Sequence, residues 1–302
     1  MKTISRRTFL KLLGVAGAAP LLRPLSVVAA QPEASLVLFN GKIITVDGSD
    51  SVAEAIAVRG QRIIAVGPTQ RIRSFAGRDS TLIDLQGRAV TPGLIDSHAH
   101  LPPFGSRELY WVKLQGVRSK EEILELIAAR AEKTPEGRFI NAWGVESDDL
   151  AFMDRRDLDA VTTRHPVLVV HTTGQWGFAN SAALELGGVN QATESPPGSL
   201  VEKGPRGEPT GLLIHYPALY LVRRAVPPPT PEQMEEGIAH AAALYARDGV
   251  TCIHDNFFMV TGMSSVESAR LYFDLAASGR LPLRLKIWPY LPTLADTLDA
   301  VQ

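Results

Sequence analysis

The stretch that decides the fold is Pro92-Gly93-Leu94-Ile95-Asp96-Ser97-His98-Ala99-His100, in a chain of 302 residues. An apolar run that ends in two histidines separated by one small residue is typical of a buried β-strand with a polar end. Residues two apart in an extended chain project to the same face, so His98 and His100 are expected to point at one centre. Neutral imidazole is the commonest metal ligand. The pair therefore predicts a metal site at the end of this strand, and the alternative is a solvated pair of histidines.

The surroundings of the histidine pair strengthen this interpretation. A turn sequence, Gly87-Arg88-Ala89-Val90-Thr91, precedes the strand, and Asp96 stands two residues before the first histidine. Together these residues resemble the first barrel strand of the amidohydrolase superfamily, metal-dependent hydrolases built on a TIM barrel. The resemblance implies an α/β fold: an incomplete (β/α)₈ barrel of the metal-dependent hydrolase type, preceded by part of a small β-sandwich. It makes His98 and His100 the first two metal ligands. Asp96, expected on the same face, could orient one of them.

The amino terminus is expected to be a targeting segment. Ser5-Arg6-Arg7-Thr8-Phe9-Leu10-Lys11 resembles the twin-arginine export signal, and the apolar run after it is too short to span a bilayer. We expect residues 1–30 to be a signal peptide, the twin-arginine export machinery to be a partner, and the mature protein to be periplasmic or extracellular. No stable membrane anchor is expected.

Charge and cysteine content narrow the classes of partner. The predicted signal peptide holds five cations and no acid, which leaves 26 cations against 32 acids in the rest of the chain. This mildly acidic balance argues against nucleic acid or an anionic membrane as a partner. Cys252 is the single cysteine, so no intramolecular disulfide can form.

Residues 31–91 are expected to form the amino-terminal part of the β-sandwich. Asn40-Gly41 predicts a hairpin between short strands at 36–39 and 42–46. A second hairpin is expected over 55–67, and a third strand near 82–88.

Residues 92–302 are expected to form the hydrolase barrel, with its first three strands at 92–100, 249–255 and 283–288. A long insertion, at about 101–248, separates the first two strands. Within it, Ser119 is expected to cap a helix whose apolar stripe comprises Ile123, Leu124, Leu126, Ile127 and Ala131. Further predictions are strands at 139–144 and 167–171 and helices at 231–247 and near 264–278.

Three segments narrow the resemblance to one branch of the superfamily. They are Asn180-Ser181-Ala182-Ala183-Leu184, the run from Gly207 to Leu213, and Gly249-Val250-Thr251 before His254-Asp255. In this order they resemble amidohydrolase family 3, the YtcJ-like proteins, which include N-substituted formamide deformylase. The resemblance implies hydrolysis of C–N bonds other than peptide bonds in a small amide, by water that one or two divalent ions, expected to be Zn²⁺, activate. The runner-up is a cyclic-amide or N-acyl amino acid hydrolase, and a homo-oligomer is possible.

The resemblance also implies machinery that these residues do not contain. The family's bridging lysine, its later histidines and its aspartate general base are expected beyond residue 302, so we expect no catalytic residue within this chain. Lys286 is interpreted as a solvated or strand-edge lysine. We therefore expect the front part of a longer protein that is inactive alone. The alternative from another class is a non-catalytic fragment, at most a weak metal or ligand binder.

Five residues are candidates for contact with substrate: Gln175, Trp176, Asn180, His215 and His254. Gln175 stands where many relatives have histidine, and His215 where many have glutamate. For His215 a structural histidine is an equal alternative. His254 ends the second predicted barrel strand, at the face where sites of such barrels occur. Two further histidines, His165 and His240, are expected at the surface.

Overall fold

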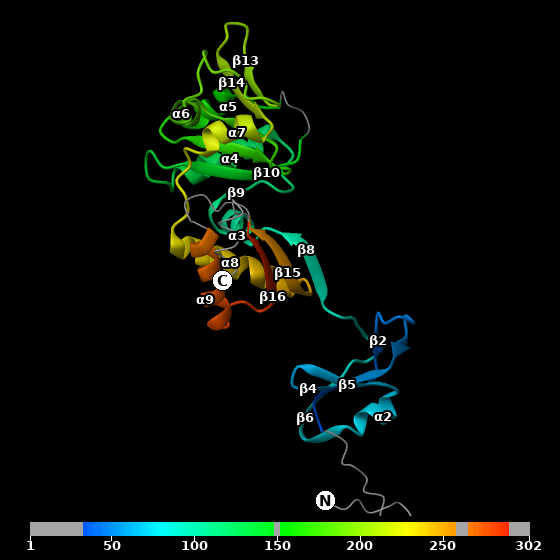
Figure 1. The fold of residues 1–302 in the computed structure, drawn as a ribbon. Coiled ribbons are helices and arrows are strands. Elements are labelled where there is room, and N and C mark those ends of the chain that lie inside the picture. Colours follow the sequence, from blue (N-terminus) through cyan, green and yellow to red (C-terminus); the bar gives the residue numbers. More distant parts are fainter. Residues whose placement is uncertain (1–32, 148–151, 258–264, 290–302) are drawn as a thin grey trace, which may run out of the picture. The chain divides into compact units, whose positions relative to one another are not determined.

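The computed structural model describes residues 33–147, 152–257 and 265–289. These residues divide into two compact units, with the boundary between Pro92 and Gly93, and each unit is described by itself (Figure 1). The predicted signal peptide, residues 1–30, lies outside the described residues. No helix in the described part of the chain is long and apolar enough to cross a membrane.

The first unit consists of two small sheets and one short helix. One sheet has the strand order β5-β4-β1-β6 and the other β3-β2-β7. Residues of both sheets meet in one apolar cluster around Ile43, Ile56 and Leu85. The elements are β1 (Ala34–Phe39), β2 (Lys42–Ile44), β3 (Val52–Ala53), β4 (Ala55–Arg59), β5 (Arg62–Gly67), α2 (Thr69–Arg73), β6 (Ala76–Asp84) and β7 (Ala89–Val90).

The predicted Asn40-Gly41 hairpin is wrong, although the hairpin over 55–67 is confirmed by the antiparallel pair of β4 and β5. β1 pairs with β4 and β6, whereas β2 pairs with β3 and β7. The Asn40-Gly41 turn therefore carries the chain from one sheet to the other. Main-chain hydrogen bonds to more distant segments hold it there: Gly41 N donates to Glu54 O (2.9 Å) and Gly87 N to Asn40 O (2.7 Å).

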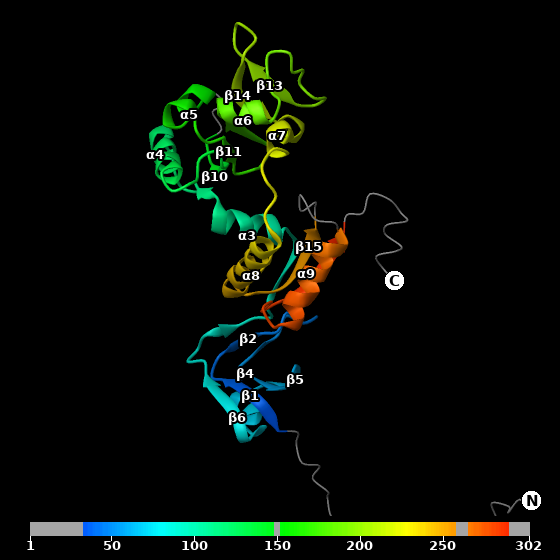
Figure 2. The same cartoon turned by 90° about the vertical axis from the view of Figure 1, so that its left-hand side faces the viewer.

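The second unit contains a three-stranded parallel sheet with the order β16-β15-β8, where β8 is Leu94–Ala99, β15 Val250–Phe257 and β16 Arg284–Pro289. The three strands predicted here are confirmed as neighbours in one sheet. The helices that pack with it are α3 (Leu101–Tyr110), α8 (Pro231–Arg247) and α9 (Ser265–Ala277), as Figure 2 shows. Buried residues from the sheet and the helices form one apolar core: Ala99, Leu101, Met234, Ile238, Ala241, Ile253, Tyr272 and Leu275.

The long insertion between β8 and β15 forms a six-stranded mixed sheet with the order β13-β14-β12-β11-β10-β9. Its strands are β9 (Val112–Lys113), β10 (Ile140–Val145), β11 (Val167–His171), β12 (Trp176–Ala179), β13 (Leu200–Lys203) and β14 (Pro209–Ile214). β9, β10 and β11 run parallel, and the remaining neighbours are antiparallel.

Helices cover both faces of this sheet, so the central strand β11 is buried on both sides. Val167 and Val169 pack with α4 (Lys120–Ala131) and α5 (Arg155–Val161), whereas Leu168 and Val170 pack with α6 (Ser181–Leu186) and α7 (Tyr216–Arg223). The alternation follows from the period of two in a strand. Each face of β11 thus contributes to its own apolar core.

The amphipathic helices largely follow their sequence patterns. The hydroxyl of Ser119 accepts a hydrogen bond from Glu122 N (3.2 Å) and caps α4, as predicted. Ile123, Ile127 and Ala131 are buried, but Leu126, which was expected in the same stripe, is 36% exposed. At about 100° per residue, Leu126 lies about 60° beyond Ile123, on the side away from Ile127 and Ala131.

Candidate metal centre and functional site

The two histidines of the opening motif lie side by side at the carboxyl end of β8. Their ring centroids are 5.1 Å apart, with the ring planes at 86°. His98 is exposed and His100 is half-buried. The structure therefore brings together the two side chains that the sequence pairs, on a surface that a ligand can reach.

Asn256 on the neighbouring strand β15 holds both imidazoles. The Nδ1 of His100 lies 2.8 Å from the main-chain oxygen of Asn256, so in the neutral ring this nitrogen carries the proton and Nε2 has the lone pair. The side-chain amide of Asn256 lies 2.6 Å from Nδ1 of His98. Its Oδ1 is buried and has no hydrogen-bond partner among the described residues. An amide turned to present this oxygen would accept Nδ1–H and leave Nε2 of His98 free to bind a metal. Sequence reasoning missed Asn256, which lies one residue beyond the strand predicted over 249–255; its place two residues after His254 was the available signal.

The donor set of this strand end fits a divalent transition ion in part. Two neutral imidazoles with their other nitrogens held are typical of zinc ligation, whereas a catalytic zinc site takes three protein ligands. Within the described ranges, no group of three or more histidine, cysteine, aspartate or glutamate side chains is placed to hold an ion. The described residues thus offer two candidate ligands.

Asp96 does not lie among the histidine rings. β8 has one more residue than β15 between the pairs Asp96–Ile253 and Ala99–Asp255, which breaks the alternation of side chains. The carboxylate of Asp96 accepts a hydrogen bond from the main-chain N of His98 (3.0 Å). Burial and the charge of Asp96 raise the pKa of Tyr245, a residue of α8, which places this carboxylate near the helices. The expectation that Asp96 shares a face with the histidines is wrong, because a strand bulge turns it towards the helices.

Asp255 is a buried carboxyl beneath the histidine pair. Burial raises its pKa, although hydrogen bonds from the Tyr272 hydroxyl and the main-chain N of Leu101 (3.3 Å) and the charge of His100 oppose this. Burial beside Asp255 in turn raises the pKa of Tyr272 well above its usual value. This carboxyl ties β15 to the start of α3 directly after His100, so it helps fix the chain that carries the second histidine.

His254 lies on β15 two residues before Asn256 and is half-buried. Its ring stacks on Trp288 of β16, with centroids 6.5 Å apart and planes at 28°. Because residues two apart share a face of a strand, His254 lies on the face of Asn256 and His98. Contact with substrate stays a prediction for this residue.

Three of the candidates in the insertion gather at one edge of the six-stranded sheet. Trp176 begins β12 opposite Ile214, the last residue of β14, so Gln175 and His215 are near neighbours. Gln175 and His215 are exposed, and His215 has a positive φ of 65° at the start of α7. Trp176 is 9% exposed and stacks on His171 with ring centroids 4.3 Å apart, so packing accounts for it. Gln175 and His215 remain predicted contacts.

Asn180 is a structural residue, and its assignment to substrate binding is wrong. Its side chain is fully buried. Oδ1 accepts from Val167 N (2.9 Å) and Ala183 N (3.0 Å), and Nδ2 donates to Thr162 O (3.1 Å) and His165 O (2.9 Å). These four bonds use the capacity of the amide, cap α6 and leave nothing for a ligand.

The same network corrects the expected exposure of His165. This residue is 1% exposed, because the loop that carries it packs under the Asn180 amide. His240 is half-buried on α8, and Lys286 is exposed on β16 as expected.

Comparison with known proteins identifies the family. Residues 81–302 match the profile of the amidohydrolase family. The chain belongs to the amidohydrolase family. Residues 3–22 match the twin-arginine translocation signal, so this amidohydrolase carries a signal for twin-arginine export.

Curated relatives extend over most of this amidohydrolase chain. Protein LONG AFTER FAR-RED 3 of Arabidopsis thaliana is 34% identical over 74% of this chain and 38% of its own length. N-substituted formamide deformylase of Arthrobacter pascens is 28% identical over 83% of this chain and 46% of its own length. Putative amidohydrolase YtcJ of Bacillus subtilis is 30% identical over 81% and 46%. The chain thus spans less than half the length of these relatives, and the resemblance to the YtcJ-like branch is confirmed.

A solved structure supports the same fold. An uncharacterized metal-dependent hydrolase from Pyrococcus horikoshii superposes with a TM-score of 0.60 at 23% identity, over 88% of this chain and 50% of that one. Residues 33–289, so far as they are described, therefore have the fold of metal-dependent hydrolases.

Proposed function

We propose that this amidohydrolase chain is part of a metal-dependent enzyme that hydrolyses C–N bonds other than peptide bonds, with a small formamide or amide as substrate. The observation that carries the proposal is the pair of imidazoles at the end of β8, with His100 oriented through Nδ1 by the Asn256 carbonyl. The relative named N-substituted formamide deformylase supports the choice of bond.

In this proposal His98 and His100 hold the metal, one or two divalent ions that we take to be Zn²⁺. When bound, such an ion polarises a carbonyl and activates water for hydrolysis. Asn256 positions both imidazoles, and Asp255 fixes the turn between His100 and α3. Gln175, His215 and His254 are the proposed contacts with the substrate.

We further propose that β8, β15 and β16 are the first three strands of a (β/α)₈ barrel and that residues 31–91 belong to its accompanying β-sandwich. The remaining ligands and the general base would then come from sequence outside these 302 residues. With two ligands in its described residues, the chain alone would be a weak binder of zinc and would hydrolyse no amide. The signal at residues 3–22 supports a periplasmic or extracellular site of action.

The test of the metal role is a zinc titration of the chain against a competing chelator. We expect one saturable site whose affinity falls at least about tenfold in His98→Ala and in His100→Ala, since each removes one of two ligands. His240→Ala, which removes a histidine on α8, is the matched control and should bind as the unchanged chain does. Equal zinc affinity in all four proteins would contradict the proposal, and the exposed position of His98 makes misfolding an inadequate explanation for a loss there.

The reaction is tested separately, with N-substituted formamides and the zinc-loaded chain. We expect no hydrolysis above the background measured with His98→Ala. Hydrolysis that depends on His98 would support the metal role and would overturn the proposed dependence on residues outside this chain.

A further inference from the structure

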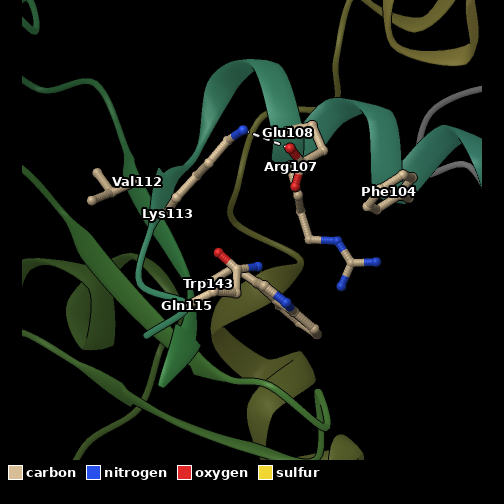
Figure 3. Close-up of a pocket in the computed structure, with 7 residues that line it drawn as sticks. All are labelled: Phe104, Arg107, Glu108, Val112, Lys113, Gln115 and Trp143. Atoms are coloured by element: carbon tan, nitrogen blue, oxygen red, sulfur yellow. Dashed lines mark hydrogen bonds and ion pairs between the residues drawn. The ribbon is translucent and has the colours of Figure 1, made fainter. Parts of the chain in front are cut away.

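A small cavity with an unused cation lies between α3 and the edge of the six-stranded sheet. Its volume is about 150 Å³, and its wall includes Phe104, Arg107, Glu108, Lys113 and Trp143. Figure 3 shows Arg107 reaching from α3 towards the indole of Trp143, with Lys113 and Glu108 paired beside the helix. None of these residues has a role in the function proposed above.

The guanidinium of Arg107 is held in place, but its two terminal nitrogens make no hydrogen bond to the described residues. Its Nε donates to the main-chain oxygen of Pro103 (3.0 Å), and its carbon atom Cζ lies 3.9 Å from the centroid of the Trp143 ring. Neither terminal nitrogen has a hydrogen bond to any described residue. Stacking on an aromatic ring leaves the edge of the guanidinium open, and that edge is the fork that matches a carboxylate with two hydrogen bonds.

Glu108 attracts the charge of Arg107, but no carboxylate among the described residues is bonded to its guanidinium. The neighbouring carboxylate of Glu108 is paired with Lys113, whose Nζ lies 2.5 Å from Oε2. Arg223 of α7 adds a second cation. Burial and the charge of Arg223 lower the pKa of Arg107 to about 10, so it is still a cation at neutral pH. An anion in the cavity would relieve this repulsion.

We propose that this cavity binds the carboxylate of a small organic acid, with the carboxylate on the fork of Arg107 and the apolar part against Trp143 and Phe104. One negative charge matches the guanidinium of Arg107, which is paired with no carboxylate among the described residues. The small volume limits the ligand to a compact acid. The proposal goes beyond the hydrolase function and needs no metal, so the two can fail independently.

The test is a titration of the full chain with benzoate, followed by the fluorescence of its tryptophans and by calorimetry, and compared with benzamide. Benzamide has the same shape without the charge. We expect one saturable site for benzoate and binding at least about tenfold weaker for benzamide, because charge-assisted bonds to the guanidinium are lost. Equal binding of the two would overturn the proposal.

Substitutions that are expected to change benzoate affinity in opposite directions test whether benzoate binds in this cavity. Arg107→Gln should weaken benzoate about tenfold or more, and Arg107→Lys should recover little, since lysine keeps the charge without the fork. Glu108→Gln should tighten benzoate by about threefold, because it removes the nearest negative charge. Arg118→Gln, an exposed arginine outside the cavity, is the matched control and should change nothing. If Arg107→Gln unfolds at a lower temperature, the changes in benzoate affinity in Arg107→Lys and Glu108→Gln still test the site. Unchanged affinity in both variants would contradict it.

The pH dependence gives a further check. Benzoate stays ionised from pH 6 upwards, so its affinity should be flat to about pH 9 and fall as Arg107 loses its proton near pH 10. The other charged or titrating groups that act on Arg107 or line the cavity are Arg223, Glu108, Tyr245 and Lys113. Lys113 is a second cation in the wall of the cavity. The measurement is therefore repeated in Lys113→Arg, where the fall must persist; a flat profile to pH 11 in that variant would exclude Arg107 as the partner of the carboxylate.

Discussion

The end of β8 and the end of β12 both carry polar residues that the sequence marks as candidates for function, yet the structure uses them differently. Asn180 after β12 is fully buried and makes four hydrogen bonds. His98 near the end of β8 is exposed, and among the described residues its ring nitrogens contact only the amide of Asn256. The difference teaches that unused hydrogen-bonding capacity, rather than position after a strand, separates a ligand-binding residue from a structural one.

The largest effect is expected from Asn180. Asn180→Ala removes four buried hydrogen bonds and leaves their main-chain partners unsatisfied, so the free energy of unfolding should fall by about 3 kcal/mol or more. The measurement is urea unfolding followed by circular dichroism. Gln175→Ala, an exposed amide on the same sheet, is the control and should change stability by less than about 0.5 kcal/mol. Equal effects of the two substitutions would erase the distinction between the strand ends.

An intermediate effect is expected from Tyr272, which lies beneath the histidines. Tyr272→Phe keeps the buried ring but removes the hydroxyl that donates to Asp255. We expect the free energy of unfolding to fall by about 1–2 kcal/mol, because the buried carboxyl loses a donor. Phe273→Tyr, next to it and 69% exposed, offers a control that adds a hydroxyl to the helix surface. An unchanged free energy of unfolding in Tyr272→Phe would show that Asp255 does not need this donor.

The smallest effect on stability is expected at the proposed metal centre. His98→Ala should change the free energy of unfolding by less than about 0.5 kcal/mol in the absence of metal, since the side chain is exposed. The same substitution should abolish the stabilisation that added zinc gives the unchanged chain. A large loss of stability without zinc would mean that His98, like Asn180, is structural.

Much of the architecture could be predicted from local pattern. The hydrophobic run Val167 to His171 predicts a strand buried on both faces, and the strand β11 has those bounds. The helix expected over 231–247 is α8, which begins at Pro231 after a capping box of Thr230 and Gln233. These signals are local, so the sequence around each element contains them.

The misses share a different cause, because they depend on contacts between distant segments. Nothing near Asn40-Gly41 shows that β1 pairs with β6, more than 35 residues later, rather than with β2. The bulge that turns Asp96 away from the histidines appears only in the register with β15. Asn180 is assigned correctly only once its partners Thr162 and His165 are known.

The candidate site divides in the same way. The pairing of His98 with His100 follows from the period of a single strand and is found as predicted. The role of Asn256 arises because β15 lies beside β8. This pairing brings Asn256 next to His100 and His98, which are separated from it in the sequence by 156 and 158 positions. A pattern within one strand finds the candidate ligands, whereas the groups that orient them come from its neighbours.

The most direct test of the central claim is X-ray absorption spectroscopy of the zinc-loaded chain. We expect two imidazole ligands, with Zn–N distances of about 2.0–2.1 Å and the outer-shell scattering typical of histidine. In the double variant His98→Ala, His100→Ala this imidazole scattering should disappear, while His240→Ala should leave it intact. A spectrum without imidazole scattering in the unchanged chain, or one that the double variant leaves unaltered, would contradict the assignment of His98 and His100 as the metal ligands.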